Sequence, residues 1–352
     1  MTPPQYRVSD ADLSRDRDAV VSVWDGSIGW AGRLPEMFDA FYRDCPLGQP
    51  LLKLLHHQPE NTVIGTIGAG PRRILWRGQE IRAGVVSHLA VLPAHRSVKP
   101  GIFLSRSLVE MARGRFDVLY GLPSSKGAAL AKLAGFKVGG QLIRQVKILR
   151  YQNYIDRVLP QPASVIGGAL INFANQTWDR MRRLVEAGSA HAEWVNHVDP
   201  RMDRLWQQSP HGERWTSIRD ATMLHWRFDR LPSARRRYLL LSPIRDGELT
   251  AWFACDTNVH DPHMLSVNDF WTIDGVQAVD PVSIRTLCRA AYREGFHSIE
   301  LRFTGSEEAH ASWSAEGFVE RSRQPLIVIW LNQELAGETE GMLHITDIEN
   351  DG

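Results

Sequence analysis

The sequence predicts an α/β fold made of two similar halves, each a mixed, mostly antiparallel sheet flanked by helices. The 352 residues are 43% hydrophobic, which is enough for two domains with cores of their own. Three landmarks recur in the same order about 182 residues apart, and such self-similarity indicates a repeat. In each half, strands are followed by a strand–helix–strand–helix succession, which is typical of a sheet covered by helices.

The landmarks are a tryptophan in an apolar helical stretch, an aromatic residue four positions before a proline, and a helix that runs into Gly-Phe. They occur at Trp24 and Trp206, at Tyr42…Pro46 and Phe228…Pro232, and at Gly135-Phe136 and Gly317-Phe318. Each is common alone, but three in order predict two copies of one unit, at residues 1–150 and 190–333. We expect Tyr42 and Phe228, and likewise Phe136 and Phe318, to be equivalent core positions.

The first half supplies the clearest elements. Residues 61–92 predict an antiparallel meander with a hairpin turn at "WRGQEI". A helix over 101–114, a strand over 116–123 and a helix over 125–134 follow.

Two segments lie outside the halves. Residues 151–189 contain Pro160 and Pro162 and then a helix-like stretch, so we expect a helical linker packed on one domain. An amphipathic contact with a membrane or a partner is the less favoured alternative, because its polar face is not rich in lysine. Residues 334–352 carry acidic residues and no Lys or Arg, which predicts a solvated tail.

Composition excludes several classes. The formal charge of +1 gives no global field that favours nucleic acid or a membrane surface. Cys45, Cys255 and Cys288 have no paired spacing, so we expect neither a disulfide framework nor a metal site. No signal peptide is visible at the N-terminus, and the apolar stretch 163–174 is too short to span a bilayer. We expect a cytoplasmic protein without a membrane span, and the oligomeric state stays open.

The stretch "VSHLAVLPAHRSVKPGIFLSRSL", residues 86–108, predicts a candidate anion site. It reads as an apolar strand, then a basic turn, then a helix that Gly101 opens. Free N–H groups and the positive end of the helix dipole would stabilise a phosphate there, with Arg96 and Lys99 beside it. The alternative is a plain strand-to-helix turn with solvated basic residues.

Residues 35–140 resemble the GNAT acyltransferase superfamily, through "FYRDCPLGQP", "VLPAHR…GIF" and "YGLPSSKGAALAKLAGF". The specific resemblance is to bacterial GNAT-domain proteins found with polysaccharide biosynthesis. The second half, from "LHWRFDRLP" to "EGFVE", resembles a degenerate GNAT fold. Mycothiol synthase and the Fem-type aminoacyl transferases have a similar tandem arrangement. The resemblance implies two tandem GNAT-like domains and transfer of an acyl group from acetyl-CoA or another acyl-CoA to an amine.

The resemblance also implies a cofactor site. The family holds the pyrophosphate in an Arg/Gln-x-x-Gly-x-Gly/Ala turn; counted from Arg96, Lys99 replaces the first glycine and Pro100 removes an N–H donor. The free strand edge would pair with the pantetheine amides, and polar residues after the next strand would contact the CoA arm. The implied cofactor residues are Leu89, Ala90, Val91, Arg96, Lys99, Gly101, Ile102, Ser124 and Ser125. For the two serines, a helix N-cap is an equally good interpretation.

The second half lacks a comparable loop. Asp269, Asp274 and Asp280 precede its helix, where carboxylates would repel a diphosphate. We therefore expect no CoA there, and expect this half to supply one wall of an acceptor cleft.

Acyl transfer to an amine needs a base for the ammonium proton and an acid for the leaving thiolate. The family's acidic tyrosine position is Ala131 in this chain. His88 is our candidate base and Tyr120 a substitute acid, and a core histidine and a core tyrosine are the alternatives.

The acceptor is the least defined part of the prediction. Residues 201–237 hold nine arginines against four acidic residues, so "SARRRY" would suit an anionic acceptor such as a nucleotide-linked amino sugar. A solvated surface with local salt bridges is preferred slightly, and nucleic acid is not expected. The function hypothesis is an N-acetyltransferase acting on a small-molecule amine, with polysaccharide precursors suggested by resemblance alone. Lys99 and Ala131 favour a non-catalytic scaffold instead; a Fem-type aminoacyl transferase is a third alternative that the near-neutral charge speaks against.

Overall fold

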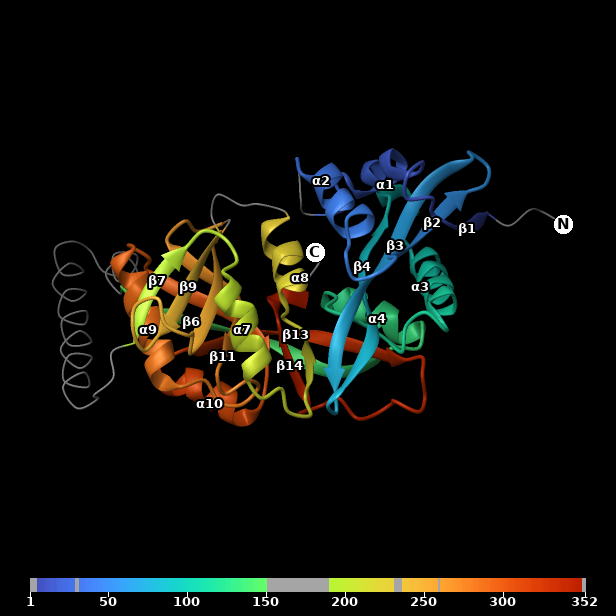
Figure 1. Cartoon of the computed structure of the whole chain (residues 1–352). Coiled ribbons are helices and arrows are strands. Elements are labelled where there is room, and N and C mark those ends of the chain that lie inside the picture. Colours follow the sequence, from blue (N-terminus) through green and yellow to red (C-terminus); the bar gives the residue numbers. More distant parts are fainter. Residues whose placement is uncertain (1–4, 29–31, 151–189, 231–235, 259, 350–352) are drawn as a thin grey trace. The chain divides into compact units, whose positions relative to one another are not determined.

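Residues 5–28, 32–150, 190–230, 236–258 and 260–349 are described by the structure, a computed structural model (Figure 1). The chain forms two units, and neither is continuous in sequence. Unit 1 draws on residues 1–142, 211–232 and 323–352, and unit 2 on residues 143–210 and 233–322. The expected linker, 151–189, lies outside the described residues.

The sheet of unit 1 has the strand order β1-β2-β3-β4-β5-β13. The bounds are β1 (Tyr6–Asp10), β2 (Leu51–His57), β3 (Thr62–Trp76), β4 (Gln79–Val91), β5 (Val118–Gly121) and β13 (Val319–Trp330). β1 to β4 pair antiparallel, β4 and β5 pair parallel, and β5 and β13 pair antiparallel. The hairpin predicted at "WRGQEI" is present, because Arg77 and Gly78 both adopt the positive φ that a tight two-residue turn requires.

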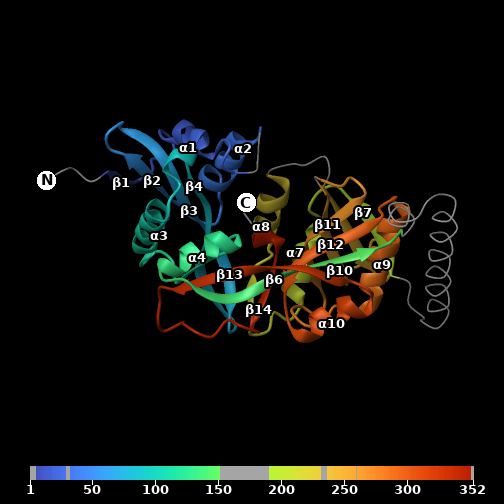
Figure 2. The ribbon, with the colours of Figure 1, turned by 180° about the vertical axis from the view of Figure 1, so that it is seen from behind.

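Helices cover this sheet. They are α1 (Arg17–Trp24), α2 (Leu34–Phe38) continued by the π-helical turn η1 (Asp39–Arg43), α3 (Val98–Ala112) after the 3₁₀ turn η2 (Pro93–His95), and α4 (Ser125–Leu133). α3 and α4 lie side by side in both views (Figures 1 and 2). The apolar face of α3, with Leu104, Leu108 and Ala112, shares one core cluster with Leu51 and Leu55 of β2.

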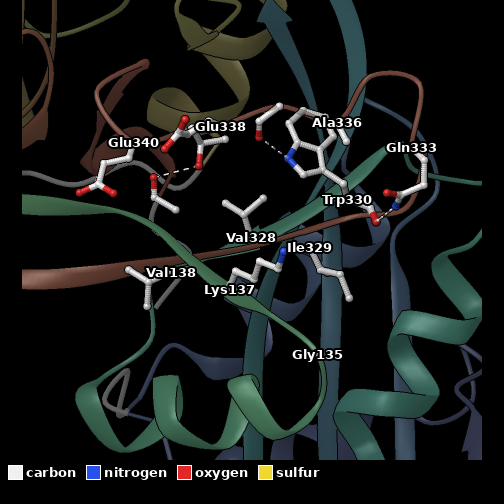
Figure 3. A pocket seen from close by; sticks show the side chains of 13 residues that line it. Gly135, Lys137, Val138, Val328, Ile329, Trp330, Gln333, Ala336, Glu338 and Glu340 are labelled. Carbon is white, nitrogen blue, oxygen red and sulfur yellow. Dashed lines mark hydrogen bonds between the residues drawn. The ribbon is translucent and has the colours of Figure 1, made fainter.

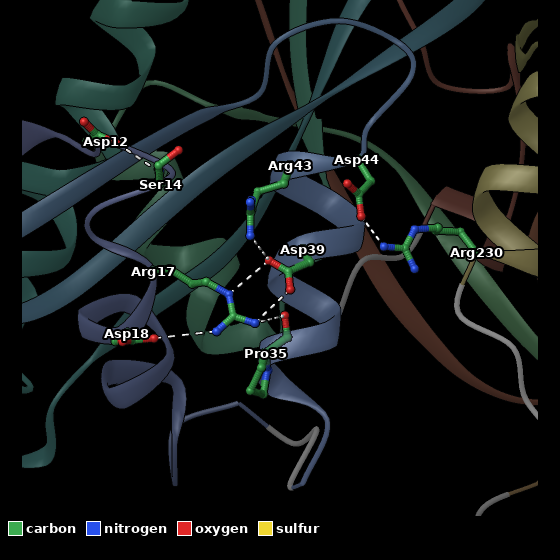
Figure 4. A network of polar contacts seen from close by, with 9 residues as sticks. All are labelled: Asp12, Ser14, Arg17, Asp18, Pro35, Asp39, Arg43, Asp44 and Arg230. Atoms are coloured by element: carbon green, nitrogen blue, oxygen red, sulfur yellow. Dashed lines mark hydrogen bonds and ion pairs between the residues drawn. The ribbon is translucent and has the colours of Figure 1, made fainter.

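A polar network fixes η1 (Figure 4). The Arg17 guanidinium of α1 donates to both carboxylate oxygens of Asp39, at 3.0 and 2.8 Å, and Arg43 approaches the same carboxylate at 3.3 Å. These hydrogen bonds, from Arg17 first, lower the pKa of Asp39. Asp44, just past η1, pairs with Arg230. The bidentate geometry orients η1, which carries Tyr42.

Two further pieces of unit 1 come from late in the sequence. The first contains β8 (Trp215–Ser217), α8 (Ala221–Leu224) and the π-helical turn η3 (His225–Asp229), and the second contains β14 (Leu343–Thr346) and the 3₁₀ turn η4 (Asp347–Glu349). β14 pairs parallel with β8, which pairs with β3.

The expectation of a solvated tail over residues 334–352 is wrong for its described C-terminal part. Leu343, Ile345 and Ile348 are buried, and the first two join a core cluster with Trp76 and Trp215. The acidic side chains at Glu338 and Glu340 are exposed as expected, but the apolar alternation of β14 provides enough buried surface to hold the segment in the core.

Unit 2 contains the strand order β6-β12-β11-β10-β9-β7. Its strands are β6 (Lys137–Ile148), β7 (His191–Val195), β9 (Arg236–Ser242), β10 (Ala251–Thr257), β11 (Met264–Thr272) and β12 (Ser298–Thr304), and its helices are α7 (Pro200–Gln208), α9 (Pro281–Arg293) and α10 (Glu307–Ala315). Phe253, Phe270 and Trp313 are in its core cluster. Unit 2 is thus a mixed sheet with helices.

Several elements recur 182 residues apart. Ser124 and Ser306 cap α4 and α10 with their side chains, and β6 and β13 begin and end at matching positions. Tyr42 and Phe228, which are 186 residues apart, each lie buried in a π-helical turn. The last strand of each half, however, pairs in the unit built mainly from the other half: β6 with β12, and β13 with β5.

Ile345→Ala tests the packed C-terminal segment. Ile345 is fully buried, so its truncation should lower the free energy of unfolding by roughly 2–5 kcal/mol through lost burial and a cavity. Glu334→Ala, on the exposed part of the same segment, is the control and should stay within about 0.5 kcal/mol of wild type. Denaturant unfolding measures both; equal stability of the two variants would contradict the packing.

Candidate functional site

The neighbouring strands β4 and β5 separate partway along their length. They pair only from Ala83 to Val85 on β4 and from Val118 to Tyr120 on β5. β4 then stays paired with β3 up to Val91, whereas the chain leaves β5 after Gly121. A cavity of about 280 Å³ lies at this fork. Its wall includes His88 and Leu89 of β4, Ser105 of α3, Ala131 of α4 and Glu349.

A β-bulge accompanies the fork. Ser87 pairs with Gly68 and Ala90 with Thr66, so His88 and Leu89 together face one residue of β3. His88 has a φ of 55°, in the left-handed region that residues other than glycine rarely adopt. Its carbonyl oxygen accepts a 2.9 Å hydrogen bond from the Thr66 hydroxyl, which in turn accepts one from the Trp24 indole at 3.0 Å. These bonds hold the strained residue in place.

The His88 ring is buried among aromatic side chains and two hydroxyl groups. It stacks on Trp24 at 4.5 Å between centroids, and its Nδ1 lies 2.8 Å from the Tyr42 hydroxyl and 3.1 Å from that of Ser87. A Cβ at Gly68 would lie 2.0 Å from the Tyr42 oxygen, so glycine is required for Tyr42 to reach His88. His88, the predicted base, lies on the wall of this cavity.

Tyr120, the second predicted catalytic residue, lies behind the cavity wall. It is fully buried and packs edge-on against Trp215, as the core interpretation expects. Its hydroxyl, however, donates a hydrogen bond to Oε2 of Glu349, whose side chain does line the cavity. Oε1 of Glu349 is buried and has no hydrogen-bond partner among the described residues. Tyr120 thus reaches the cavity through Glu349.

Sequence reasoning missed Glu349 because it assigned residues 334–352 to a solvated tail. The only available signal is the alternation of Leu343 and Ile345, which is a strand pattern. Burial raises the pKa of the Glu349 carboxyl, against the lowering effects of Arg72, 3.8 Å from Oε2, and of the Tyr120 hydroxyl. A carboxyl with a raised pKa exchanges its proton closer to neutral pH and is a better base at that pH.

The expected phosphate turn differs from its prediction at the helix start. α3 begins at Val98 with Ser97 as N-cap, and the Ser97 side chain makes no capping hydrogen bond. Gly101 lies inside the helix, where a Cβ would come within 2.5 Å of Leu130 Cδ1 of α4; the glycine serves helix packing. Lys99 is exposed in the first turn, beside N–H groups that α3 does not use itself.

The remaining cofactor candidates are distributed around the fork. Arg96 donates to the Val91 carbonyl at 2.8 Å and to the Ser27 hydroxyl at 3.1 Å, so its guanidinium braces the turn. Leu89 lines the cavity, while Ala90 and Val91 pair with β3.

Three further candidates lie in or beside α3 and α4. Ile102 is half-buried in α3. Ser124 lines the cavity and also caps α4 by accepting a hydrogen bond from Gly127 N at 3.3 Å, and Ser125 is exposed beside it. Ala131, where the resemblance places a tyrosine, presents only a methyl group to the cavity.

A second, larger cavity of about 690 Å³ lies in unit 1 between the start of β6, the end of β13 and residues 333–340 (Figure 3). Lys137, Glu338 and Glu340 provide its charges, and the Trp330 indole donates to the Gly337 carbonyl across its edge. Its described lining contains no histidine, cysteine or tyrosine. The smaller cavity at the fork, with His88 and Glu349, is therefore the candidate active site.

The arginines of residues 201–237 are divided between the two units. Arg219 and Arg227 lie in unit 1, and Arg219 is fully buried; in unit 2, Arg201 pairs with Glu193 and Asp199. Further pairs are Arg236–Asp256 and Arg237–Glu294. Local salt bridges thus account for Arg201, Arg236 and Arg237. Residues 233–235 of "SARRRY" lie outside the described residues. The anionic acceptor stays a prediction.

Glu349→Gln tests the buried carboxyl through the pH dependence of stability. Because the folded-state pKa is raised above the ordinary 4.5, the stability contributed by this titration is fully present below the unfolded-state pKa. It is lost as the pH rises through the folded-state pKa. The free energy of unfolding of wild type relative to Glu349→Gln should therefore fall as the pH rises above the ordinary pKa of 4.5. Urea titrations measure it; a pH-independent difference would contradict the raised pKa.

Comparisons with known proteins place the fold. No family model matches the sequence, and no curated protein matches it. A GCN5-related N-acetyltransferase from Anabaena variabilis aligns with a TM-score of 0.62 over 93% of this chain and 73% of its own, at 11% identity. A GCN5-related N-acetyltransferase from Kribbella flavida aligns with a TM-score of 0.60 over 94% and 72%, at 12% identity.

At sequence identities this low, the alignments show a similar fold and do not show a shared activity. Both alignments extend over nearly the whole chain, so the similarity is not confined to the residues around the fork. Among the described residues, every helix falls short of the length and apolar character that crossing a membrane demands. The chain has the α/β fold of the GCN5-related N-acetyltransferases.

Proposed function

We propose that this protein is an acyl-CoA-dependent N-acyltransferase whose active site is the cavity at the β4–β5 fork. The observation that carries the proposal is the combination of an unpaired strand edge, a strained residue at His88 and the Glu349 carboxyl on one cavity wall. Strained backbone and buried titratable groups cluster at catalytic sites. The fold is the one in which the similar structures are named N-acetyltransferases.

The fork suits an extended thioester cofactor. Beyond Val85, β4 has no β5 partner, so its N–H and C=O groups on that side are available to the amides of a pantetheine arm. The α3 N-terminus follows η2 directly, and its N–H groups with Lys99 suit a diphosphate. The thioester end then reaches the cavity beside His88.

The reaction follows from the groups on the wall. The acceptor amine attacks the thioester carbonyl carbon, an amide C–N bond forms, and the C–S bond breaks to release a thiolate. Glu349 Oε1, which has no hydrogen-bond partner among the described residues, takes the ammonium proton, and Tyr120 holds Oε2 in position. His88, hydrogen-bonded to Tyr42, supplies a proton to the thiolate. This assignment moves the base from His88 to Glu349 and makes Tyr120 a positioning residue.

The recurring elements support a tandem duplication in which the second copy does not use CoA. The acceptor is proposed to be a small-molecule amine, and its anionic character and any role in polysaccharide synthesis rest on the sequence resemblance alone. Three observations favour the non-catalytic alternative: Lys99 replaces the first glycine of the turn, Ala131 stands where the resemblance places a tyrosine, and Pro100 removes an N–H donor from the first turn of α3.

Calorimetry with acetyl-CoA tests the cofactor site. Wild type should bind, and Lys99→Glu should weaken binding at least about tenfold because a carboxylate would face the diphosphate. Lys132→Glu, an equal charge reversal on the exposed last turn of α4, is the matched control and should bind like wild type. If the wild-type protein does not bind acetyl-CoA, the proposal is wrong and the non-catalytic scaffold hypothesis is favoured.

Turnover with a panel of small amines tests the proton path. Glu349→Gln and His88→Ala should each lower kcat by about a hundredfold or more with little change in acetyl-CoA affinity. Glu340→Gln, an exposed carboxyl near the second cavity, is the matched control and should retain full activity. Circular dichroism checks that the variants fold. Full activity of folded Glu349→Gln would remove Glu349 from the mechanism.

A further inference from the structure

We infer that His57, Glu60 and His95 form a binding site for a divalent transition metal, with Zn²⁺ as the best match. One ligand atom of each of the three lies within 4.8 Å of those of the other two. The site is separate from the cavity at the fork, since none of its residues lines that cavity. It departs from the expectation of no metal, which rested on the cysteines alone.

Sheet topology brings these residues together from distant positions in the sequence. His57 ends β2 and pairs with Thr62 at the start of β3, and Glu60 lies in the turn between them. The end of β4 returns to the same edge, because Leu92 N donates to the Ile64 carbonyl. His95, in η2, is fixed three residues later by its own N–H to the Leu92 carbonyl at 2.9 Å.

The turn geometry directs Glu60 back toward His57. Asn61 has a φ of 52°, and its N–H donates to the Gln58 carbonyl, which closes a short hairpin loop around Pro59 and Glu60. As a result, Glu60 Oε2 lies 3.1 Å from His57 Nδ1. The carboxylate is mostly exposed, so it can rotate by the small amount that metal coordination requires.

The state of His57 is the second, independent observation. Its side chain is about nine-tenths buried, and among the described residues its Nδ1 makes no hydrogen bond of acceptable geometry. It has only the ion-pair contact with the Glu60 carboxylate, and the centroid of the His95 ring is 4.6 Å from that of the His57 ring. A buried ring nitrogen without a hydrogen bond is costly. A metal ion between the three ligands would satisfy it.

His95 also has an outer partner. Its Nδ1 lies 3.4 Å from the Tyr6 hydroxyl, and the Tyr6 ring meets the His95 ring edge-on. Metal-binding histidines commonly use their second ring nitrogen in this way, which fixes tautomer and orientation. Binding through Nε2 would leave the Tyr6 contact intact.

The donor set selects the ion. Two imidazoles and one carboxylate, with a fourth position open to water, are a zinc set with ligand distances of about 2.0–2.2 Å. Oxygen-preferring Ca²⁺ and Mg²⁺ fit poorly because two of the three donors are nitrogen. A bound ion would cross-link the β2–β3 hairpin to η2, the turn that leads into α3.

Zinc titration of the full chain, freed of metal by a chelator, tests the inference. We expect one Zn²⁺ per chain, a rise in melting temperature on binding, and the visible absorption of four-coordinate Co²⁺ when cobalt replaces zinc. His95→Ala and Glu60→Gln should weaken binding about a hundredfold and about tenfold, and Tyr6→Phe up to tenfold. Because Glu60 is exposed in a turn, Glu60→Gln should fold like wild type, so weaker zinc binding by this variant cannot be attributed to misfolding.

Matched histidine controls distinguish this site from non-specific metal binding by other histidines of the chain, which has 13 in all. His56 is the neighbour of His57, but its Nε2 bonds to the Ser9 hydroxyl; His263 and His297 stack at 4.3 Å in unit 2. His56→Ala and His297→Ala should bind zinc like wild type. Absence of stoichiometric binding, or wild-type binding by both His95→Ala and Glu60→Gln, would overturn the inference whatever the result with acetyl-CoA.

Discussion

A histidine in left-handed conformation inside a strand costs on the order of 1 kcal/mol or more, so His88 adopts it only because its surroundings enforce it. Thr66 holds its carbonyl, Trp24 supports both Thr66 and the ring, and Tyr42 holds Nδ1. The bulge lies where β4 and β5 separate. The free strand edge and the cavity lie at the same place. α1 and η1 therefore serve the site by carrying Trp24 and Tyr42.

The sequence was informative wherever short-range patterns decide the structure. The hairpin after Trp76 follows from turn chemistry, and the strand and helix around Tyr120 and Ser124 follow from periodicity. Tyr42 was recognised as a core aromatic, but its bond to His88 was not, because that contact depends on the absence of a side chain at Gly68. The lack of a Cβ at Gly68 leaves no trace in the pattern of apolar residues.

Long-range pairing lay beyond prediction for a different reason. β6 and β13 have matching lengths and positions in the two halves, so local sequence does not say which sheet edge each one joins. Glu349 was missed on the same grounds: a charge-rich segment reads as solvated unless the partner that buries it is known. Here that partner is β8, and the two strands are more than a hundred residues apart in the sequence.

The last strand of the second half, β13, contributes to the sheet and the cavity of unit 1. β13 covers the outer edge of β5, and its Gln324 and Ile327 line the cavity together with Glu349. Residues 35–140, which carry the clearest sequence resemblance, would by themselves leave β5 as an open edge and the cavity without its carboxyl. The later part of the sequence thus supplies structure to this cavity, because β13 and the segment after it complete its wall.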